Sequence, residues 1–393
     1  MDRILEGIKV LDFGRYIAAP FGCQLLADLG AEVIRVERPE GEPDRNRGPL
    51  TADGRSIYFI TLNRNKKAIT LDLTTSLGRE ILDGLARWAD VLVHNQPAER
   101  AREMGLDYER LGAMNPRLIH LSVSGFGTTG PYARNFAFDP VVQSMVGAAE
   151  MTGAAESPML SHIPYIDFGT ALYGALGIMA ALLQRERTGL GQHIDLPLLG
   201  TGVSIVAAYG VFAEFALNGV ARRAVGNDMI YGLGGLYRCV DGELSIAVVG
   251  DALFRRLCRV IGHPELLDDA RLKTDMLRYE NRAIINEPLA AWLAGRTVAE
   301  SRTALADAGV PCGEVNSVAQ AYAHPQIAAL EIVRSLDQPE VGAVPVGGMP
   351  MRLGNAEWAE AAPAPGLGEH NDEIYDSIFG VGTAERLRAE GAI

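Results

Sequence analysis

The sequence predicts an α/β protein, with a large domain built on a doubly wound parallel sheet and a second, smaller α+β domain. Within residues 1–122, short apolar segments of strand length alternate with helix-like segments, which is the pattern of βαβ units. Further along, an Asp241-Gly242 turn joins two strand-like segments and is the strongest short hairpin pattern in the chain. At 393 residues, the chain is long enough for two domains that each bury a substantial core.

The expected elements of the large domain follow one another from the N-terminus. A strand at 8–13 leads into a helix at 18–29, with Pro20 in its first turn and Gly30 at its end. A strand at 32–37 completes a βαβ unit, whose two strands should be parallel with a right-handed crossover. The same pattern predicts a helix at 78–89 and further strands at 67–73, 91–94 and 118–122.

The character of the chain changes after about residue 220. The predicted hairpin strands lie at 237–240 and 244–249, and helices rich in Arg and Leu follow at 252–261, 279–293 and 298–308. We therefore expect the N-terminal part of the large domain, a linker, the small domain and a C-terminal linker that returns to the large domain, at 1–205, 206–224, 225–325 and 326–393.

Composition argues against several classes of protein. The formal net charge is −13, and because nucleic-acid binding needs a basic face, general nucleic-acid binding is disfavoured. The four cysteines stand far apart without a CxxC pair, which argues against a zinc site or a redox dithiol. We expect no metal, and we expect reduced, mostly buried thiols in a cytoplasmic protein.

Neither an export signal nor a membrane span is expected. Residues 1–9 hold four charges and no apolar stretch. The longest uncharged run, 196–213, contains Pro197 and only reaches the lower limit of membrane-span length. We interpret this run as a buried interior helix.

Ligands of a doubly wound sheet bind beyond the carboxyl ends of its strands, here in loops at 14–17, 38–42, 72–75, 95–99 and 124–134. None of these loops contains GxGxxG, and the chain has no GxxxxGK[ST] loop, so a dinucleotide-linked dehydrogenase is disfavoured. Basic residues gather near these loops, either as a phosphate-binding cluster or as scattered solvated charges. They are Arg15, Arg35, Arg38, Arg64, Lys66 and Lys67.

Asp167 is the most informative single residue. It precedes an almost uninterrupted run of apolar and small residues that extends to Leu183. Because a carboxylate at the mouth of a buried helix is costly to desolvate, Asp167 is a candidate for chemistry. Aspartate is also a common N-cap, and this segment alone favours that structural role.

A second candidate segment is glycine-rich. Three glycines lie within Gly232–Gly235, immediately before the predicted hairpin. Glycine permits backbone conformations and close approaches that a Cβ would prevent. The segment is therefore either a flexible lid over a site or a plain loop before the strand, and the sequence leaves both readings open.

Nearly the whole chain resembles the class III coenzyme A transferases, the group of formyl-CoA transferase and carnitine CoA-transferase. No single motif decides the resemblance, which rests on the order and spacing of many segments. The similar segments lie at 5–13, 29–37, 62–73, 124–132, 138–143, 167–170, 188–192, 308–313 and 365–370.

The resemblance implies an interlocked homodimer and a covalent mechanism in which Asp167 is the nucleophile. Its carboxylate would attack the donor thioester, and a small carboxylic acid would finally accept CoA. Backbone N–H groups of Gly232, Gly234 and Gly235 would stabilise the oxyanions if that loop closes. An acyl-CoA is then a substrate, and neither a permanently bound cofactor nor a metal is expected.

By resemblance, the coenzyme A contacts fall on the loops named above. The family's usual aromatic residue is replaced by Gln96, and its Pro-Gly turn by 97–99, so the neighbouring contacts depart from the family pattern. A lysine found in one member is absent at Thr74. The contacts that the resemblance implies are Tyr16, Ile17, Ala18, Arg38, Leu71, Thr74, Asn95, Gln96, Arg102 and Met104.

One alternative is an isomerase like the related α-methylacyl-CoA racemases, or a transferase that moves CoA within one dicarboxylate. The racemases pair the aspartate with a histidine, but residues 130–135 contain none. His162, five residues before Asp167, is interpreted as a structural or substrate-contacting residue. Polar residues that either bind a second substrate carboxylate or serve the dimer interface are Arg222, Arg223, Asn227, Tyr231 and Arg238.

Overall fold

The computed structural model describes residues 3–154 and 156–393 and divides the chain into two compact units. The first unit comprises the chain up to Gly147, Ser161–Gly219 and Ala328–Ile393. The second unit comprises Ala148–Leu160 and Val220–Ile327. Ala148–Leu160 was expected in the large domain, and the expected linker at 206–224 consists largely of helix.

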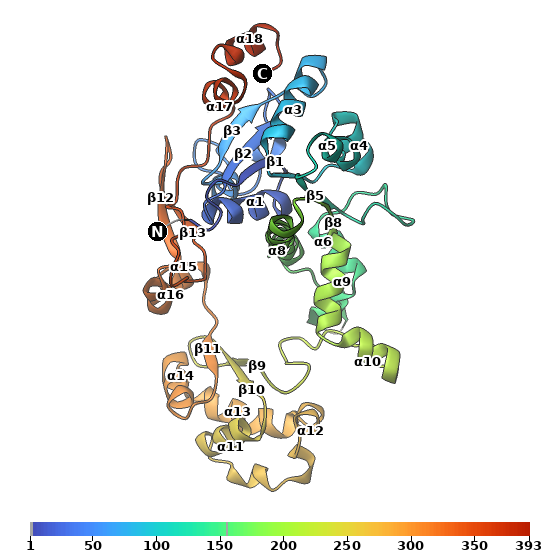
Figure 1. The fold of residues 1–393 in the computed structure, drawn as a ribbon. Coiled ribbons are helices and arrows are strands. Elements are labelled where there is room, and N and C mark those ends of the chain that lie inside the picture. The colour runs from blue at the N-terminus through green and yellow to red at the C-terminus, as the bar shows by residue number, and fades with distance from the viewer. Residues whose placement is uncertain (1–2, 155) are drawn as a thin grey trace. The chain divides into compact units, whose positions relative to one another are not determined.

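The first unit contains a six-stranded sheet in which every pair of neighbouring strands is parallel (Figure 1). This confirms the predicted doubly wound α/β class. From one edge to the other, its strands are β3 (Lys67–Thr70), β2 (Glu32–Glu37), β1 (Lys9–Phe13), β4 (Val91–His94), β5 (Ile119–Ser124) and β8 (His193–Pro197). The strand order reverses between β1 and β4, and such a switch point is where sheets of this kind bind ligands.

The last strand, β8, and the segment after it differ from the prediction. The uncharged run was expected to form one interior helix, but its first residues complete β8. Two helices follow, α9 (Leu198–Ala208) and α10 (Val211–Asn218), with a bend of 65° between them. Gly210, at φ +88°, makes this break possible because glycine tolerates the left-handed region.

Helices pack around the sheet. Helices α1 and α8 contact each other, whereas α3, α5, α17 and α18 share one hydrophobic core with the strands. The other helices of the sheet region are α2, α4 and α6, and a 3₁₀ turn, η1, spans Pro43–Asn46. Their bounds are α1 Ala18–Asp28, α2 Ile57–Asn63, α3 Ser76–Trp88, α4 Ala98–Met104, α5 Tyr108–Met114, α6 Asp139–Met145, α8 Tyr165–Thr188, α17 Asn371–Phe379 and α18 Thr383–Ala389.

The C-terminal segment returns to the first unit. Its hairpin, β12 (Val333–Gln338) and β13 (Gly342–Gly347), packs with residues of α2 in a small core of its own. Helix α17 then lies beside β3 (Figure 1), where Asn371 accepts the backbone N–H of Thr70 at 2.9 Å and the Tyr375 hydroxyl donates to its carbonyl at 2.6 Å. These bonds hold the end of the chain against the edge strand of the sheet.

The second unit contains a three-stranded antiparallel sheet in the order β11-β10-β9. The predicted hairpin around Asp241-Gly242 is present, but its first strand starts at Leu233 rather than at 237. Strands and helices of this unit are α7 (Ala148–Met151), β6 (Gly153–Ala154), β7 (Ser157–Pro158), β9 (Leu233–Arg238), β10 (Glu243–Val248), α11 (Asp251–Val260), α12 (Asp275–Glu280), α13 (Ala283–Ala294), α14 (Val298–Asp307), β11 (Cys312–Glu314) and α15 (Val318–Tyr322). Helix α16 (Pro325–Leu330) spans the boundary between the units.

Helix α8 is long and apolar enough to cross a membrane, and α9 with α10 would pass the same test only as one bent span. In this fold α8 packs on α1, β5 and β8. Its last turn carries the buried Arg185, which is paired with Asp90 at 3.0 Å. Core helices of globular proteins share this length and composition, so these two features do not distinguish a membrane span from a core helix.

Candidate active site

A cavity of about 590 Å³ lies at the switch point of the sheet, within the first unit. Its walls come from the loop after β1, the loop after β4, the end of β5 and the segment that leads to α6. The main lining residues are Arg15, Tyr16, Ile17, Ala18, Asn95, Gln96, Arg102, Ser122, Phe126, Phe138 and Asp167. The cavity therefore lies where the strand order predicts a ligand site.

Asp167 does not cap its own helix. The carboxylate of Asp139, which begins α6, accepts the backbone N–H of Ile166 at 2.7 Å and that of Asp167 at 3.1 Å. Asp139 is buried and is held by Gln143, whose amide also accepts the N–H of Ser161 at 2.9 Å. Because Asp139 satisfies these first-turn donors, the Asp167 carboxylate is left available to the cavity.

The Asp167 carboxylate is half-buried and has no hydrogen-bond or ion-pair partner among residues 3–154 and 156–393. Burial, with a smaller contribution from the negative charge of Asp139, raises its pKa to about 7. Two carboxylates next to each other without a cation are uncommon in a folded protein, since each disfavours ionisation of the other. A desolvated, unpaired carboxylate in a cavity is suited to nucleophilic or acid–base chemistry.

Six of the ten expected coenzyme A contacts line the same cavity as Asp167. They are Tyr16, Ile17, Ala18, Asn95, Gln96 and Arg102. The amide of Asn95 is bonded on both sides to the backbone of Arg15, accepting at 2.9 Å and donating at 2.7 Å. Asn95 thus joins the loop after β4 to the loop after β1.

The other four expected contacts do not line this cavity. Leu71 is buried in the core beneath the sheet, and Met104 packs against that core. Thr74 is exposed and donates its hydroxyl to Asp72 at 2.6 Å. Arg38 is exposed over 43% of its side chain and is paired with Glu40 at 3.0 Å. Of these four residues, two therefore lie in or against the core and two lie at the surface, whereas the other six face the cavity.

The basic residues near the loops do not form a free cationic cluster. Each has a carboxylate partner within 3.2 Å, so the phosphate-binding interpretation of the cluster as a whole lacks support. The pairs are Arg15–Glu42, Arg35–Asp44, Arg38–Glu42, Arg64–Asp28, Lys66–Asp12 and Lys67–Glu32.

Most of the glycine-rich segment is strand rather than loop. Residues 233–238 form strand β9 of the second unit, and Gly232 directly precedes it, so both the flexible-lid and the plain-loop interpretations are wrong for Gly234 and Gly235. Their φ angles are +155° and +157°, and an added Cβ would lie 2.4 Å from the carbonyl oxygen of Ile246 and 2.6 Å from that of Asn227. Glycine is required here because the neighbouring backbone leaves no room for a side chain.

A cluster of three histidines in the cavity wall was not predicted. The hydroxyl of Ser122 lies 2.9 Å from Nε2 of His193, 3.2 Å from Nε2 of His94 and 3.4 Å from Nδ1 of His120. Burial lowers the pKa of His94 and lowers that of His120 to about 4, so both rings are neutral at pH 7. The alternation of residues 120 and 122 along β5 places their side chains on one face of the sheet and was the available sequence signal. Across the described ranges, no group of residues is arranged to hold a metal.

An α/β fold with a desolvated carboxylate in a cavity at its switch point is the arrangement of an enzyme that uses nucleophilic or acid–base chemistry. The family model for CoA-transferase family III matches residues 5–371. The chain belongs to this family, and it is an enzyme that transfers CoA; both confirm the sequence-based prediction.

The chain is 33% identical to succinyl-CoA:glutarate CoA-transferase of Mus musculus, covering 99% of this chain and 90% of that protein. It is also 33% identical to succinyl-CoA–D-citramalate CoA-transferase of Chloroflexus aurantiacus, with 96% and 95% covered. Among solved structures, a CAIB/BAIF family protein from Brucella suis superimposes with a TM-score of 0.83 at 34% identity, covering 95% of this chain and 99% of that one.

Proposed function

We propose that this enzyme transfers CoA from succinyl-CoA to a small dicarboxylic acid through covalent intermediates on Asp167. The observation that supports the mechanism is the unpaired Asp167 carboxylate in the cavity at the switch point. The substrate class is supported by relatives that are named for succinyl-CoA and for glutarate or citramalate.

The reaction runs in two halves. In the first half, an Asp167 carboxylate oxygen attacks the thioester carbonyl, the C–S bond breaks, and an aspartyl–acyl anhydride and CoA thiolate form. The thiolate then attacks the aspartyl carbonyl, which releases the donor acid as a carboxylate and leaves an aspartyl-CoA thioester. In the second half, the acceptor carboxylate attacks this thioester and the thiolate attacks the new anhydride. The product is the acceptor's CoA thioester, and the Asp167 carboxylate is regenerated.

The surroundings of Asp167 suit this role. An attacking carboxylate must be ionised, and a partly desolvated one is a stronger nucleophile than a carboxylate surrounded by water. Because its pKa is raised to about 7, a substantial fraction is ionised at neutral pH without a cation that would quench its reactivity. The position of Asp167 in the first turn of α8 adds the favourable field of a helix N-terminus when the negative charge returns to it.

The six cavity residues are proposed to hold the acyl-CoA, together with Arg38, Leu71, Thr74 and Met104 outside this cavity. The oxyanion of each tetrahedral intermediate needs N–H donors, and the backbone of Gly232, Gly234 and Gly235 is our proposed source. A crystal structure of the trapped aspartyl-CoA thioester is the test. Donors to the thioester oxygen from any other segment would exclude these glycines.

A homodimer is proposed on the apolar surface of α8, α9 and α10. Large apolar side chains on these helices are exposed within the first unit, and a contiguous apolar surface commonly marks an interface. They include Leu172, Leu176, Leu183, Val203, Phe212 and Phe215. Sedimentation equilibrium at micromolar concentration should give twice the mass of 42.2 kDa, and a monomer would exclude the dimer.

We propose a cytoplasmic location. The four cysteines are free thiols, three of them buried, as expected in a reducing compartment. Fractionation of cells that express the protein from its native gene tests this, and recovery with membranes or outside the cell would contradict it.

The decisive experiment is incubation of the purified enzyme with succinyl-CoA and a panel of carboxylic acids, with mass spectrometry of the CoA thioesters. We expect new thioesters with C4 or C5 dicarboxylic acids and, after rapid quenching, CoA attached to Asp167. Hydroxylamine should inactivate the enzyme only when donor thioester is present, because it attacks the aspartyl intermediate. Wash-in of deuterium at Cα of an acyl-CoA without CoA exchange would instead identify an isomerase.

A further inference from the structure

Tyr16, in the cavity wall, has a strained backbone. Its φ of +64° lies in the left-handed region, which a bulky residue rarely adopts. Such strain costs on the order of 1–3 kcal/mol and persists only where surrounding contacts enforce it. The ring of Tyr16 lies edge-on to that of Phe138, with centroids 5.6 Å apart, and both rings line the cavity. The strained residue is therefore part of the proposed acyl-CoA site.

Three consecutive backbone N–H groups of this loop are each bonded to a side-chain oxygen, the first from the end of β1 and the other two from distant residues. The donors are successive residues, so the whole turn after β1 is fixed rather than one point of it. The bonds run from Gly14 to Oδ1 of Asp12 at 2.8 Å, from Arg15 to Oδ1 of Asn95 at 2.9 Å, and from Tyr16 to Oδ2 of Asp44 at 3.1 Å. The last of these bonds holds the strained residue itself.

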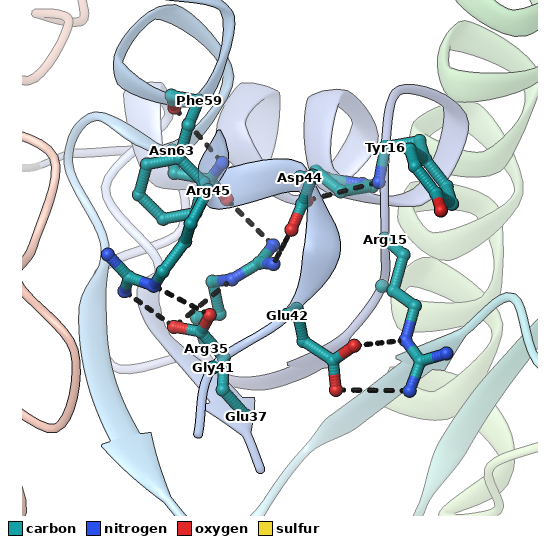
Figure 2. A network of polar contacts seen from close by, with 12 residues as sticks. Arg15, Tyr16, Arg35, Glu37, Gly41, Glu42, Asp44, Arg45, Phe59 and Asn63 are labelled. Carbon is teal, nitrogen blue, oxygen red and sulfur yellow. Dashed lines mark hydrogen bonds and ion pairs between the residues drawn. The ribbon is translucent and has the colours of Figure 1, made fainter. Parts of the chain in front are cut away.

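Asp44 is in turn held by a buried arginine (Figure 2). Nη2 of Arg35 donates to both Asp44 oxygens, at 2.8 and 3.0 Å, and Nη1 donates to Oδ1 of Asn63 at 3.0 Å. Neither Arg35 nor Asp44 has solvent-exposed surface. Arg35 also lies 3.4 Å from a Glu37 oxygen, and Glu37 binds Arg45. The carboxylate that accepts the Tyr16 N–H is therefore fixed on its other side.

A buried network of this kind is weak grounds for stability, because desolvation of its charges offsets most of their attraction. A more specific role for this network is to hold Asp44 in place as the acceptor of the strained Tyr16 N–H. Figure 2 shows this arrangement, with Asp44 between the Arg35 guanidinium and the loop that contains Arg15 and Tyr16. Pre-ordering a binding loop improves affinity because the loop has less freedom to lose when the ligand binds.

We propose that Asp44 is a positioning residue: held by Arg35, it keeps Tyr16 in the left-handed conformation and so presets the loop for acyl-CoA. The proposal rests on the proposed function, since acyl-CoA is taken to occupy the cavity that Tyr16 lines. The effect on loop order does not depend on the identity of the ligand, and this allows the two ideas to be tested separately.

The test compares Asp44→Asn with Glu37→Gln. Each replaces one carboxylate beside Arg35 by its amide, but only Asp44 is bonded to the loop. In Asp44→Asn, the amide nitrogen must face a donor, either Arg35 or Tyr16. We expect amide hydrogen exchange in residues 10–20 to accelerate at least about fivefold in Asp44→Asn and to stay unchanged in Glu37→Gln, the change expected for loss of one hydrogen bond.

Steady-state kinetics provide the second readout. The KM for succinyl-CoA should rise about five- to tenfold in Asp44→Asn, with a smaller change in kcat, while Glu37→Gln keeps the wild-type KM. Tyr16→Gly should reduce this difference, because glycine adopts the left-handed conformation without the Asp44 contact. No such coupling is expected between Tyr16→Gly and Glu37→Gln.

The outcomes separate the two proposals. Unchanged loop exchange in folded Asp44→Asn, or equal effects in Glu37→Gln, would overturn the positioning role even if transfer activity is intact. A wild-type protein that neither binds nor turns over acyl-CoA would refute the proposed function, whereas the exchange comparison would still decide the role of Asp44. If Asp44→Asn does not fold, Asp44→Glu retains the charge next to Arg35 but displaces the acceptor from the Tyr16 N–H, and the same comparisons apply.

Discussion

Two charge-rich regions of the first unit are built on opposite principles. Around Arg35, each buried charge faces an opposite charge, as in the pairs Arg35–Asp44 and Arg45–Glu37. At the start of α8, the carboxylates of Asp139 and Asp167 lie in one site without a cation among the residues that the structure describes. Glu37 is buried and Asp167 is half-buried in the cavity wall, so both carboxylates lose contact with water. The two regions differ in the charges that lie beside them.

The pKa values of Glu37 and Asp167 follow from this difference in neighbouring charge. Burial by itself acts to raise the pKa of both carboxylates, Glu37 and Asp167. For Glu37, the hydrogen bond from Arg45 and the charge of Arg35 outweigh burial, and the net pKa is lowered. For Asp167, burial and then the negative charge of Asp139 both act in the same direction, and the pKa rises to about 7. A desolvated carboxylate that faces a cation stays ionised and serves the structure. A desolvated carboxylate without a cation has a raised pKa and is available for chemistry.

The largest effect is expected from Asp167→Asn, which removes the uncompensated carboxylate. We expect CoA transfer to fall by at least about 10³-fold, because loss of a covalent nucleophile removes both halves of the reaction. A coupled assay with succinyl-CoA measures the rate.

The same variant should not lose stability. The raised pKa means that folding favours the protonated Asp167, so this residue contributes stability at low pH that is lost as pH rises through about 7. Asp167→Asn should therefore unfold at the same or a higher temperature than wild type at pH 8. A marked decrease in Tm would show that the carboxylate is structural.

In the compensated region, Arg35→Met should destabilise the fold by about 3–5 kcal/mol, because it leaves the buried Asp44 carboxylate without its cation. Urea unfolding followed by circular dichroism measures this. Arg38→Met is the matched control, since Arg38 is 43% exposed in its pairs with Glu40 and Glu42 and should cost less than about 1 kcal/mol. Equal losses in the two variants would contradict the distinction between buried and exposed pairs.

The pH dependence of kcat/KM tests how Asp139 affects the ionisation of Asp167. Since only the ionised Asp167 attacks, kcat/KM should decrease as pH falls below about 7, tenfold per unit at low pH. Asp139→Asn removes the neighbouring negative charge, and its amide oxygen can still accept the N–H groups of α8. The midpoint should therefore move to lower pH, and an unchanged midpoint would exclude Asp139 as a cause of the shift.

The smallest effect is expected at the surface. Lys67 is about one-third exposed and bridges Glu32 at 2.9 Å and Glu373 at 2.7 Å. Lys67→Ala should cost roughly 0.2–1 kcal/mol in 20 mM salt and less in 1 M salt, because exposed pairs are screened. Thermal unfolding at the two salt concentrations checks this, and a salt-independent loss would point to lost packing of the Lys67 stem.

Much of the fold was accessible from local patterns. The strands at 9–13, 32–37 and 91–94 were predicted to within a residue, since alternation of short apolar runs with amphipathic helices is a property of neighbouring residues. The prediction failed at β8, where Pro197 and an uncharged run masked a strand end and two helices. It also failed at Gly234 and Gly235, because a glycine-rich loop and a strand crowded by other backbone have the same local sequence.

Local patterns in the sequence were enough to predict the order of strands and helices, the family and the candidate carboxylate. That Asp167 is free became clear from the folded chain, because the capping role is taken by Asp139, 28 residues earlier in the chain. The fold also pairs basic residues near the loops with carboxylates far away in the chain, as in Lys66–Asp12 and Arg64–Asp28. Capping and charge compensation depend on which distant residues the fold brings together, and local sequence patterns do not encode those contacts.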